Sequence, residues 1–187
     1  MVKKISTCVF ISGNGSNLKS IIESSRDYNF PLTIKLVISN NKNAHGIKYA
    51  KKYDIPHKFY SSKNLCLFER NCLYELKKKR IKFLCLAGFM RILSKKFIES
   101  FGYKIVNIHP SLLPKFKGLK THKRVLKNKE KYTGWTVHCV SPKLDGGDII
   151  MQKKIRINNN ETESSLKKRV LIEEHKLYPK AIRSLFK

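Results

Sequence analysis

The sequence has little that would place it in a membrane or in an oxidising compartment. Its apolar runs, such as residues 9–11 and 83–87, are far shorter than the roughly 20 residues that span a bilayer. No long apolar segment follows the lysines at positions 3 and 4, so no secretory leader is expected. Cysteine is scarce, with five residues among 187 and none in a CxxC pair. We therefore expect a cytoplasmic protein with reduced, mostly buried thiols, no metal site and no disulfide framework.

Acidic residues are also few, and this raises the question of nucleic-acid binding. Thirteen Asp and Glu residues oppose 40 Lys and Arg residues, which leaves a formal net charge of +27. Such an excess is typical of proteins that bind phosphate backbones. The basic residues are, however, spread along the whole chain, without a basic tail or a recognisable nucleic-acid-binding motif. We interpret the charge as a solvated basic surface that would steer an anionic substrate, and we keep a nucleic-acid-binding protein as an alternative.

Length and composition favour a single folded unit. The chain has 187 residues, of which 41% are hydrophobic and 10% aromatic. This is enough for one compact domain, expected to span residues 1–187.

Short apolar runs alternate along this chain with amphipathic stretches of helical period. The pattern predicts strands over 5–11, 32–39, 57–60, 83–87, 104–109, 132–140 and 149–157. It predicts helices over 17–26, 44–53, 65–79, 94–100, 120–128 and 161–186, with the last helix interrupted at Pro179. Such alternation indicates an α/β, Rossmann-like domain, in which helices cover both faces of a mostly parallel central sheet. The C-terminal third is expected to add its strands to the same sheet.

A glycine-rich loop follows the first predicted strand and has the sequence GNGSN, residues 13–17. Small residues at a helix N-terminus let a phosphate approach the free backbone N–H groups. The loop is not a complete dinucleotide fingerprint, because Leu18 stands where a third glycine is needed, and no Gly-Lys-Ser/Thr follows. The segment is therefore either a phosphate site or a structural turn, and its place in an α/β sheet favours the phosphate site.

Asn107 and His109 lie two residues apart near the end of a predicted strand that Pro110 stops. Residues at this spacing project from the same face of a strand. Open α/β sheets keep their active sites at the carboxyl ends of strands. An amide beside an imidazole can stabilise a developing oxyanion and move a proton. The alternative is a histidine with a purely structural role.

Asp145 precedes a pair of glycines, Gly146 and Gly147, which allow a sharp turn. Such a turn could direct the carboxylate inward. Near His109, this carboxylate would favour the charged imidazolium form. Asp-Gly is also a common dipeptide of surface turns, and sequence spacing alone does not show that residues 109 and 145 meet.

Taken together, four segments that occur in this order resemble the phosphoribosylglycinamide formyltransferase family. They are residues 11–18, 86–93, 107–114 and 144–147, and the resemblance runs from about residue 5 to about residue 183. It implies the formyltransferase fold and a role in purine synthesis. The implied reaction transfers the formyl group of 10-formyltetrahydrofolate to the amine of glycinamide ribonucleotide, and it needs no metal.

The resemblance also implies roles for individual residues. The catalytic trio would be Asn107, His109 and Asp145. The nucleotide would be held by Gly15, Ser16, Asn17 and Glu174, with Glu173 as the alternative to Glu174. The folate would be contacted by Met90, Arg91, Ile92, Leu93, Asn107, Ser141, Lys143 and Leu144. Residues of about 1–100 would form the nucleotide-phosphate-binding half, and residues of about 101–187 the catalytic and folate-binding half. The expected partners are small-molecule substrates, with no specific nucleic acid or membrane, and the expected state is a monomer or weak homodimer.

Two departures from the family pattern stand out. Leu65 occupies a position where the family often has an arginine that meets the folate, and only Lys63 is nearby. The chain also ends at Lys187, where relatives usually carry a longer tail. The catalytic motifs all precede that point, so activity is expected to survive.

The alternatives within the same chemistry are sister formyl-handling enzymes. Methionyl-tRNA formyltransferases share the Asn-x-His and Leu-Asp-x-Gly patterns but normally carry an additional C-terminal domain. Formyltetrahydrofolate deformylases usually carry an N-terminal regulatory domain. Residues 118–122 resemble the glycinamide ribonucleotide enzymes better than either. His122 and His138 lie near the site motifs, although a structural role is expected for both.

Overall fold

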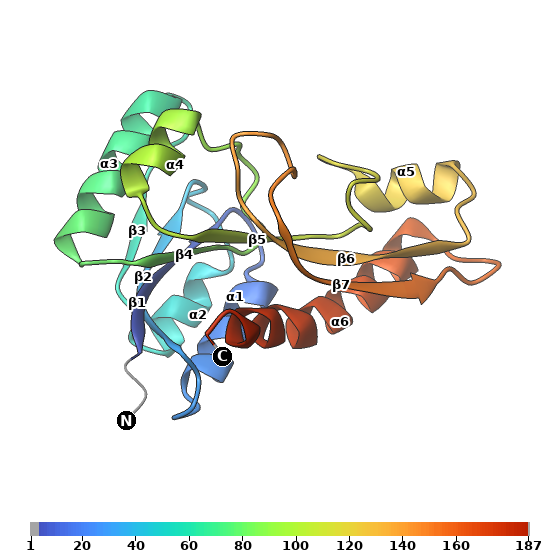
Figure 1. Ribbon diagram of the computed structural model, residues 1–187, viewed down its shortest axis with the longest axis horizontal. Coiled ribbons are helices and arrows are strands. Elements are labelled where there is room, and N and C mark those ends of the chain that lie inside the picture. Colours follow the sequence, from blue (N-terminus) through green and yellow to red (C-terminus); the bar gives the residue numbers. More distant parts are fainter. Residues whose placement is uncertain (1–3, 187) are drawn as a thin grey trace.

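The computed structural model describes residues 4–186, which are built around one seven-stranded sheet (Figure 1). The strands are β1 (Ile5–Ile11), β2 (Leu32–Ser39), β3 (His57–Phe59), β4 (Phe83–Leu86), β5 (Ile105–His109), β6 (Tyr132–Cys139) and β7 (Ile149–Arg156). The helices are α1 (Ser16–Ser25), α2 (Ile47–Lys52), α3 (Leu65–Lys78), α4 (Lys95–Phe101), α5 (Thr121–Lys127) and α6 (Glu163–Ser184). All except α2 begin and end within two residues of the expected bounds.

The strand order in the sheet is β3-β2-β1-β4-β5-β6-β7. Neighbouring strands from β3 to β5 pair in parallel, whereas β6 runs antiparallel to β5 and β7 antiparallel to β6. The expected α/β fold with a mostly parallel sheet is therefore confirmed. The C-terminal third does add its strands to the same sheet, and it adds them in the antiparallel direction.

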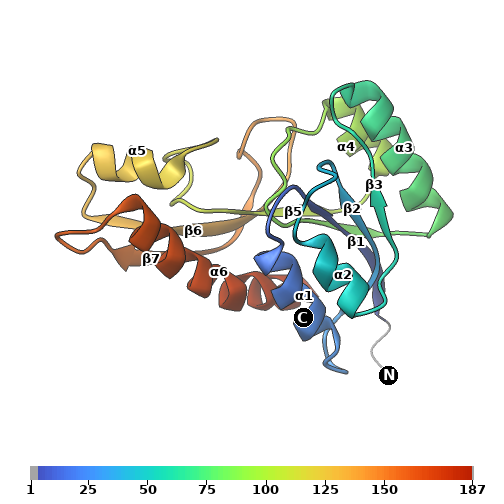
Figure 2. The ribbon, with the colours of Figure 1, turned by 180° about the vertical axis from the view of Figure 1, so that it is seen from behind.

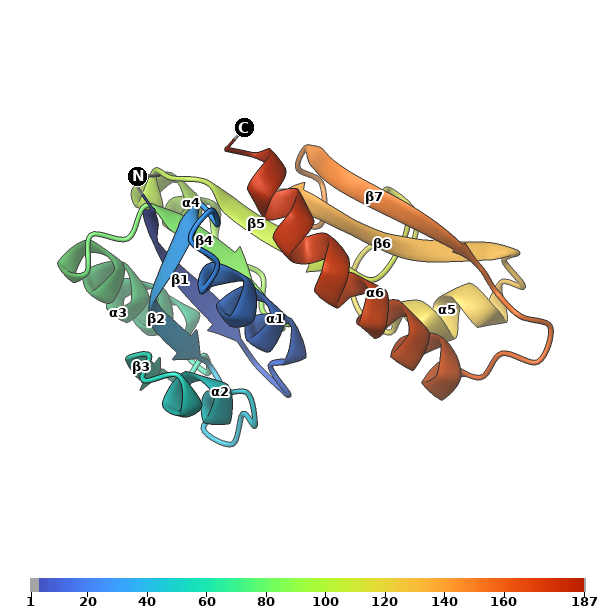
Figure 3. The ribbon, with the colours of Figure 1, turned by 90° about the horizontal axis from the view of Figure 1, so that it is seen from below.

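Alternate residues of β1 enter two different hydrophobic cores, one on each face of the sheet. Val9 and Ile11 belong to the core that includes residues of α1 and α6, whereas Cys8 and Phe10 belong to the core of α3 and α4. The ribbon seen from behind and from below shows the same layers, with α1, α2 and α6 on one face and α3 and α4 on the other (Figures 2 and 3). Covered faces are what buried parallel strands require.

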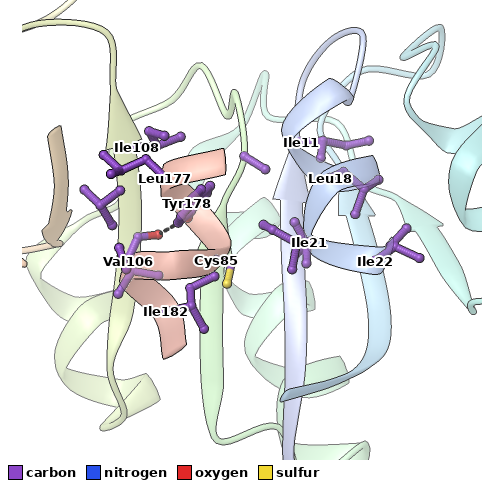
Figure 4. Packing of buried hydrophobic residues seen from close by; sticks show 14 of the residues in the cluster. Ile11, Leu18, Ile21, Ile22, Cys85, Val106, Ile108, Leu177, Tyr178 and Ile182 are labelled. Carbon is purple, nitrogen blue, oxygen red and sulfur yellow. Dashed lines mark hydrogen bonds between the residues drawn. The ribbon is translucent and has the colours of Figure 1, made fainter. Parts of the chain in front are cut away.

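The long helix α6 is attached to the sheet by Tyr178 (Figure 4). This side chain is fully buried, and its hydroxyl donates to the carbonyl oxygens of Leu86 and Val106, each 3.0 Å away. Leu177 and Ile182 belong to the same core. Because Leu86 and Val106 lie on the neighbouring strands β4 and β5, one side chain holds both strands to the helix.

The expected interruption of the last helix at Pro179 is wrong, because α6 continues unbroken from Glu163 to Ser184. Proline lacks an N–H group, so the carbonyl of His175, one turn earlier, loses its usual partner within the helix. The hydroxyl of Ser20 on α1 donates to that carbonyl. A neighbouring helix thus supplies the hydrogen bond that the proline cannot make.

Helix α2 begins at Ile47 rather than at residue 44 as expected. The residues before it form a turn that reaches back to the glycine-rich loop, where the N–H of Gly46 donates to the carbonyl of Gly13 at 2.9 Å. A contact between segments so far apart in the chain leaves no periodic signal in the sequence.

The cysteines form no disulfide within the described residues. All are free, and Cys8, Cys72 and Cys85 are buried. Burial raises the pKa of the Cys72 and Cys85 thiols, so both behave as small apolar residues. Within residues 4–186, no helix has the length and apolar character needed to cross a membrane.

Replacing Tyr178 by phenylalanine is expected to lower the free energy of unfolding by about 1–3 kcal/mol, because two buried carbonyls lose their donor. Urea denaturation measures this as a lower midpoint at unchanged slope. Tyr28→Phe is the matched control, since Tyr28 is 61% exposed and should tolerate the change. Equal midpoints for both variants would contradict the role given to the hydroxyl.

Candidate active site

The carboxyl ends of β1, β4 and β5 meet at one edge of the sheet because these strands run in parallel. Strand β1 lies where the order of the strands reverses, with β2 on one side and β4 on the other. Ligands of open α/β sheets bind outside the carboxyl ends of strands at such a point. The three sequence motifs all reach this edge, the first after β1, the second at the end of β5 and the third in the connection between β6 and β7.

The glycine-rich loop joins β1 to α1 and requires glycine at position 15. Gly15 has a positive φ of 70°, and a Cβ at this position would lie 2.4 Å from the Cα of Gly46. The two loops therefore touch through their backbones. In the described residues no side chain caps the N-terminus of α1, so its first backbone N–H groups remain available to an anion.

Glu174 reaches the glycine-rich loop from α6. Its Oε2 accepts a hydrogen bond of 2.8 Å from Nδ2 of Asn17, and both residues are only 6% exposed. Burial raises the pKa of Glu174 to about 7, an effect that the Asn17 hydrogen bond partly offsets. The alternative residue, Glu173, instead contacts Lys153 and Lys176 at the surface. Glu174 is thus the glutamate that lies at the loop.

Asp145 and His109 meet, although 36 positions separate them in the sequence. Oδ2 of Asp145 lies 3.4 Å from Nδ1 of His109 and accepts the backbone N–H of Gly118 at 2.8 Å. The turn that aims the carboxylate inward depends on Gly147, because a Cβ there would lie 1.9 Å from the carbonyl oxygen of Cys139. A side chain at position 147 would therefore not fit this turn.

Both ring nitrogens of His109 face oxygen acceptors. Nε2 lies 2.9 Å from the carbonyl oxygen of Phe116, and Nδ1 faces the carboxylate of Asp145. A neutral imidazole could donate to only one of them, whereas an imidazolium donates to both. The nearly buried ring thus lies between two oxygen acceptors, one at each nitrogen.

Asn107 is held by His138, a residue to which the sequence analysis gave only a structural role. The two are paired across β5 and β6, and Nδ2 of Asn107 lies 3.2 Å from Nε2 of His138. Nδ1 of His138 lies 2.8 Å from the carbonyl oxygen of Cys139 and donates to it. Burial lowers the pKa of His138, so its neutral ring accepts the amide hydrogen of Asn107. Only the antiparallel register reveals this partner, because the sequence carries no signal for it.

Apart from Asn107 on β5, the proposed folate-contacting residues fall into two segments on either side of the site. In the first, Met90 and Ile92 are each 60% exposed, whereas Leu93 is 3% exposed and belongs to the core of α3 and α4. The second is the loop between β6 and β7, where the exposed Lys143 and Leu144 directly precede Asp145. Ser141 donates to the carbonyl of Lys143 at 3.3 Å.

A cavity of about 480 Å³ lies beside this second segment, and its lining includes Lys95, Ser141 and Lys143. Leu65, where the family pattern often has arginine, is 37% exposed at the start of α3. Nothing in the lining of the cavity comes from α3.

The site as a whole offers acid–base and electrostatic chemistry. A histidine, an amide and a carboxylate lie together, next to segments with exposed apolar side chains. Such groups stabilise a developing oxyanion and transfer a proton. Within the described residues, no group of three or more His, Cys, Asp or Glu side chains is arranged to hold a metal ion.

The buried carboxyl of Glu174 should make stability depend on pH. Its pKa is near 7 in the folded chain and about 4.3 in an unfolded one. The folded chain therefore binds the extra proton, and wild-type stability falls as pH rises from about 4 to above 7. Relative to Glu174→Gln, the wild type is expected to lose about 1–3 kcal/mol over this range.

Urea denaturation of both proteins at pH 5 and pH 8 measures this difference. Glu173→Gln serves as the control, because that side chain pairs with lysines at the surface and such pairs contribute little. Parallel pH profiles for the wild type and Glu174→Gln would show that Glu174 titrates normally.

Comparison with known proteins identifies the family. The family model described as formyl transferase matches residues 5–182. The human trifunctional purine biosynthetic protein adenosine-3 is 41% identical over 185 residues, covering 96% of this chain and 18% of that protein. This chain therefore spans less than a fifth of the length of that relative.

Bacterial relatives have about the same length as this chain. Phosphoribosylglycinamide formyltransferase of Escherichia coli (strain K12) is 38% identical over 177 residues, covering 93% of this chain and 84% of that protein. The crystal structure of phosphoribosylglycinamide formyltransferase from Anaplasma phagocytophilum superposes with a TM-score of 0.91 at 39% identity, covering 97% of this chain and 86% of that one. The chain thus belongs to the formyl transferase family, and within it to the phosphoribosylglycinamide formyltransferases.

Proposed function

We propose that this protein transfers the formyl group of 10-formyltetrahydrofolate to the amine of glycinamide ribonucleotide. The products are formylglycinamide ribonucleotide and tetrahydrofolate, and the step belongs to purine synthesis. The observation that carries the proposal is the contact of Asp145 with His109 at 3.4 Å, at the sheet edge that also holds the glycine-rich loop. Relatives named for this reaction match nearly the whole chain.

The nucleotide is assigned to the first half of the chain, residues of about 1–100. The phosphate binds the backbone N–H groups of Gly15, Ser16 and Asn17 at the N-terminus of α1, where the helix dipole favours an anion. Glu174, from α6, binds the ribose. Its hydrogen bond with Asn17 places the carboxyl next to the phosphate loop, as this assignment requires.

The folate is assigned to the second half together with the segment 90–93. Its pterin lies between the exposed residues of that segment and the loop 141–145, and Asn107 contacts it at the reacting end. Leu93 supports the segment from the core rather than from the exposed surface. The protein has Leu65, not an arginine, at the position that would meet the negatively charged tail of the folate. Lys95 and Lys143 at the neighbouring cavity offer positive charge to the tail instead.

The reaction is a direct transfer within a ternary complex. The neutral amine attacks the formyl carbon, and a tetrahedral intermediate with a negatively charged oxygen forms. The amide of Asn107 donates to this oxygen, and so does the imidazolium of His109 once its Nε2 exchanges the carbonyl of Phe116 for the oxyanion. A proton then passes from the attacking nitrogen to N10 of the folate, through His109 or a water organised by Asp145, and the bond from N10 to the formyl carbon breaks. Asp145 stabilises the imidazolium throughout.

The second candidate function is formylation of an aminoacylated initiator tRNA. The net charge of +27 favours it, because a basic surface attracts a polyanion. For the first candidate, we propose small-molecule substrates, a cytoplasmic location and a monomeric or weakly dimeric state.

One assay separates the two candidates. Purified protein is incubated with 10-formyltetrahydrofolate and either glycinamide ribonucleotide or aminoacylated initiator tRNA, and release of tetrahydrofolate is followed. The proposal expects turnover with the nucleotide and none with the tRNA. Turnover with the tRNA alone would replace the proposed substrate.

Asp145→Asn is expected to lower turnover by roughly 10²–10⁴, the range for a positioned acid–base group. The variant keeps the shape of the side chain and removes the charge that supports the imidazolium. Binding of either substrate should change much less, because the lost interaction belongs mainly to the transition state. Steady-state kinetics measure both quantities. Asp148→Asn, an exposed change on the same loop, is the control, and equal turnover in both variants would remove Asp145 from the mechanism.

A further inference from the structure

Ser12 connects the two proposed substrate sites through its hydroxyl. The side chain lies directly after β1 and directly before the glycine-rich loop. Its Oγ donates to Oδ1 of Asn40 at 2.7 Å and accepts the backbone N–H of Met90 at 2.8 Å. The backbone N–H of Ser12 also donates to the carbonyl of Gly88 at 3.1 Å. The residue just before the glycine-rich loop is thus hydrogen-bonded to the start of the folate-contacting segment, residues 90–93.

The chain of hydrogen bonds continues through Asn40 to Arg91. Nδ2 of Asn40 donates to Oγ of Ser62 at 3.1 Å, and Nε of Arg91 donates to the same oxygen at 3.1 Å. Ser62 is only 8% exposed. A buried hydroxyl that accepts from both partners therefore fixes the guanidinium of Arg91 relative to the loop after β2. These bonds join residues that follow β1, β2, β3 and β4 at one edge of the sheet.

The other end of the folate-contacting segment has a separate anchor. The backbone N–H and the hydroxyl of Ser94 donate to the two carboxylate oxygens of Glu69, at 2.7 and 2.6 Å. Glu69 lies on α3 and is 8% exposed. Residues 90–93 therefore run between an anchor on α3 and an anchor on the phosphate loop. Of these two anchors, only the one at Ser12, beside the glycine-rich loop, can respond to the nucleotide.

We propose that Ser12, Asn40 and Ser62 are positioning residues that couple binding of the nucleotide to binding of the folate. The inference rests on the proposed function, which assigns one substrate to each end of the hydrogen-bond chain. A phosphate held by the loop restricts Ser12, and the restriction extends to the backbone of Met90 and to Arg91. The second ligand then meets a segment that is already ordered, and it loses less conformational entropy on binding. Linkage requires the effect to be equal in both directions.

Calorimetry measures the coupling directly. The dissociation constant of glycinamide ribonucleotide is determined alone and with saturating tetrahydrofolate, a pair that cannot react. We expect the folate to tighten nucleotide binding about tenfold in the wild type, within the usual range for coupled sites. Ser12→Ala and Ser62→Ala, which cut the chain of bonds at different points, should reduce the factor to about twofold or less. Ser61→Ala, an exposed neighbour of Ser62, should keep the wild-type factor.

A second measurement uses the wild type alone and does not depend on how a variant folds. Because the hydroxyl of Ser12 accepts the N–H of Met90, nucleotide binding should slow hydrogen exchange of this amide about tenfold, in line with the coupling. A structural role for Ser12 predicts no such response to the nucleotide.

The outcomes separate this inference from the proposed function. Formyl transfer with unchanged coupling in both variants, or with no coupling in the wild type, would overturn the inference and leave the function intact. If the wild type binds the nucleotide but the hydrogen-exchange rate of the Met90 amide does not change, the inference is likewise overturned and the function stands. Failure of the wild type to bind the nucleotide or to transfer formyl would overturn both.

Discussion

Parallel pairing of the strands from β3 to β5 is the constraint on which the site depends. It brings the carboxyl ends of these strands to one edge, so loops far apart in the chain become neighbours. The contacts of Ser12 with Gly88 and Met90 are direct results. The antiparallel return of β6 then places His138 opposite Asn107, and the connection to β7 brings Asp145 to His109. Tyr178 secures the two central strands from α6.

Within that frame, the carboxylate of Asp145 lies among the groups to which we assign the reaction. Asp145 is nearly buried and contacts His109, His138 and the backbone of Gly118. A charge that has lost most of its water needs hydrogen-bond donors, and the backbone N–H of Gly118 supplies one at 2.8 Å. In the proposed mechanism, His109 acts as an imidazolium that stabilises an oxyanion. Burial lowers the pKa of His138, which favours the neutral ring that accepts the amide hydrogen of Asn107.

The large positive charge has a plain physical meaning in this structure. Several of the 13 acidic side chains are engaged in specific contacts, such as Glu69 with Ser94, Asp145 with His109 and Glu174 with Asn17. The lysines lie mostly on the surface and in excess. Both proposed substrates are anions, and a positive field increases their local concentration at the site. Under the proposed function, we therefore expect the charge to attract these small-molecule substrates.

The sequence by itself determined the order and type of the elements, because buried strands and amphipathic helices leave local periodic signals. It also singled out the loop after β1, the pair Asn107 and His109, and Asp145. Each pattern alone had a structural alternative, and only their occurrence together in the order of one family indicated a site. Tertiary structure alone decided what these residues touch. It placed His138 beside Asn107, put Leu93 in the core, joined Ser12 to Met90, and kept α6 continuous through Pro179 by means of Ser20. Each of these depends on contacts between distant segments, and hydrogen bonds of this kind have no period along the chain.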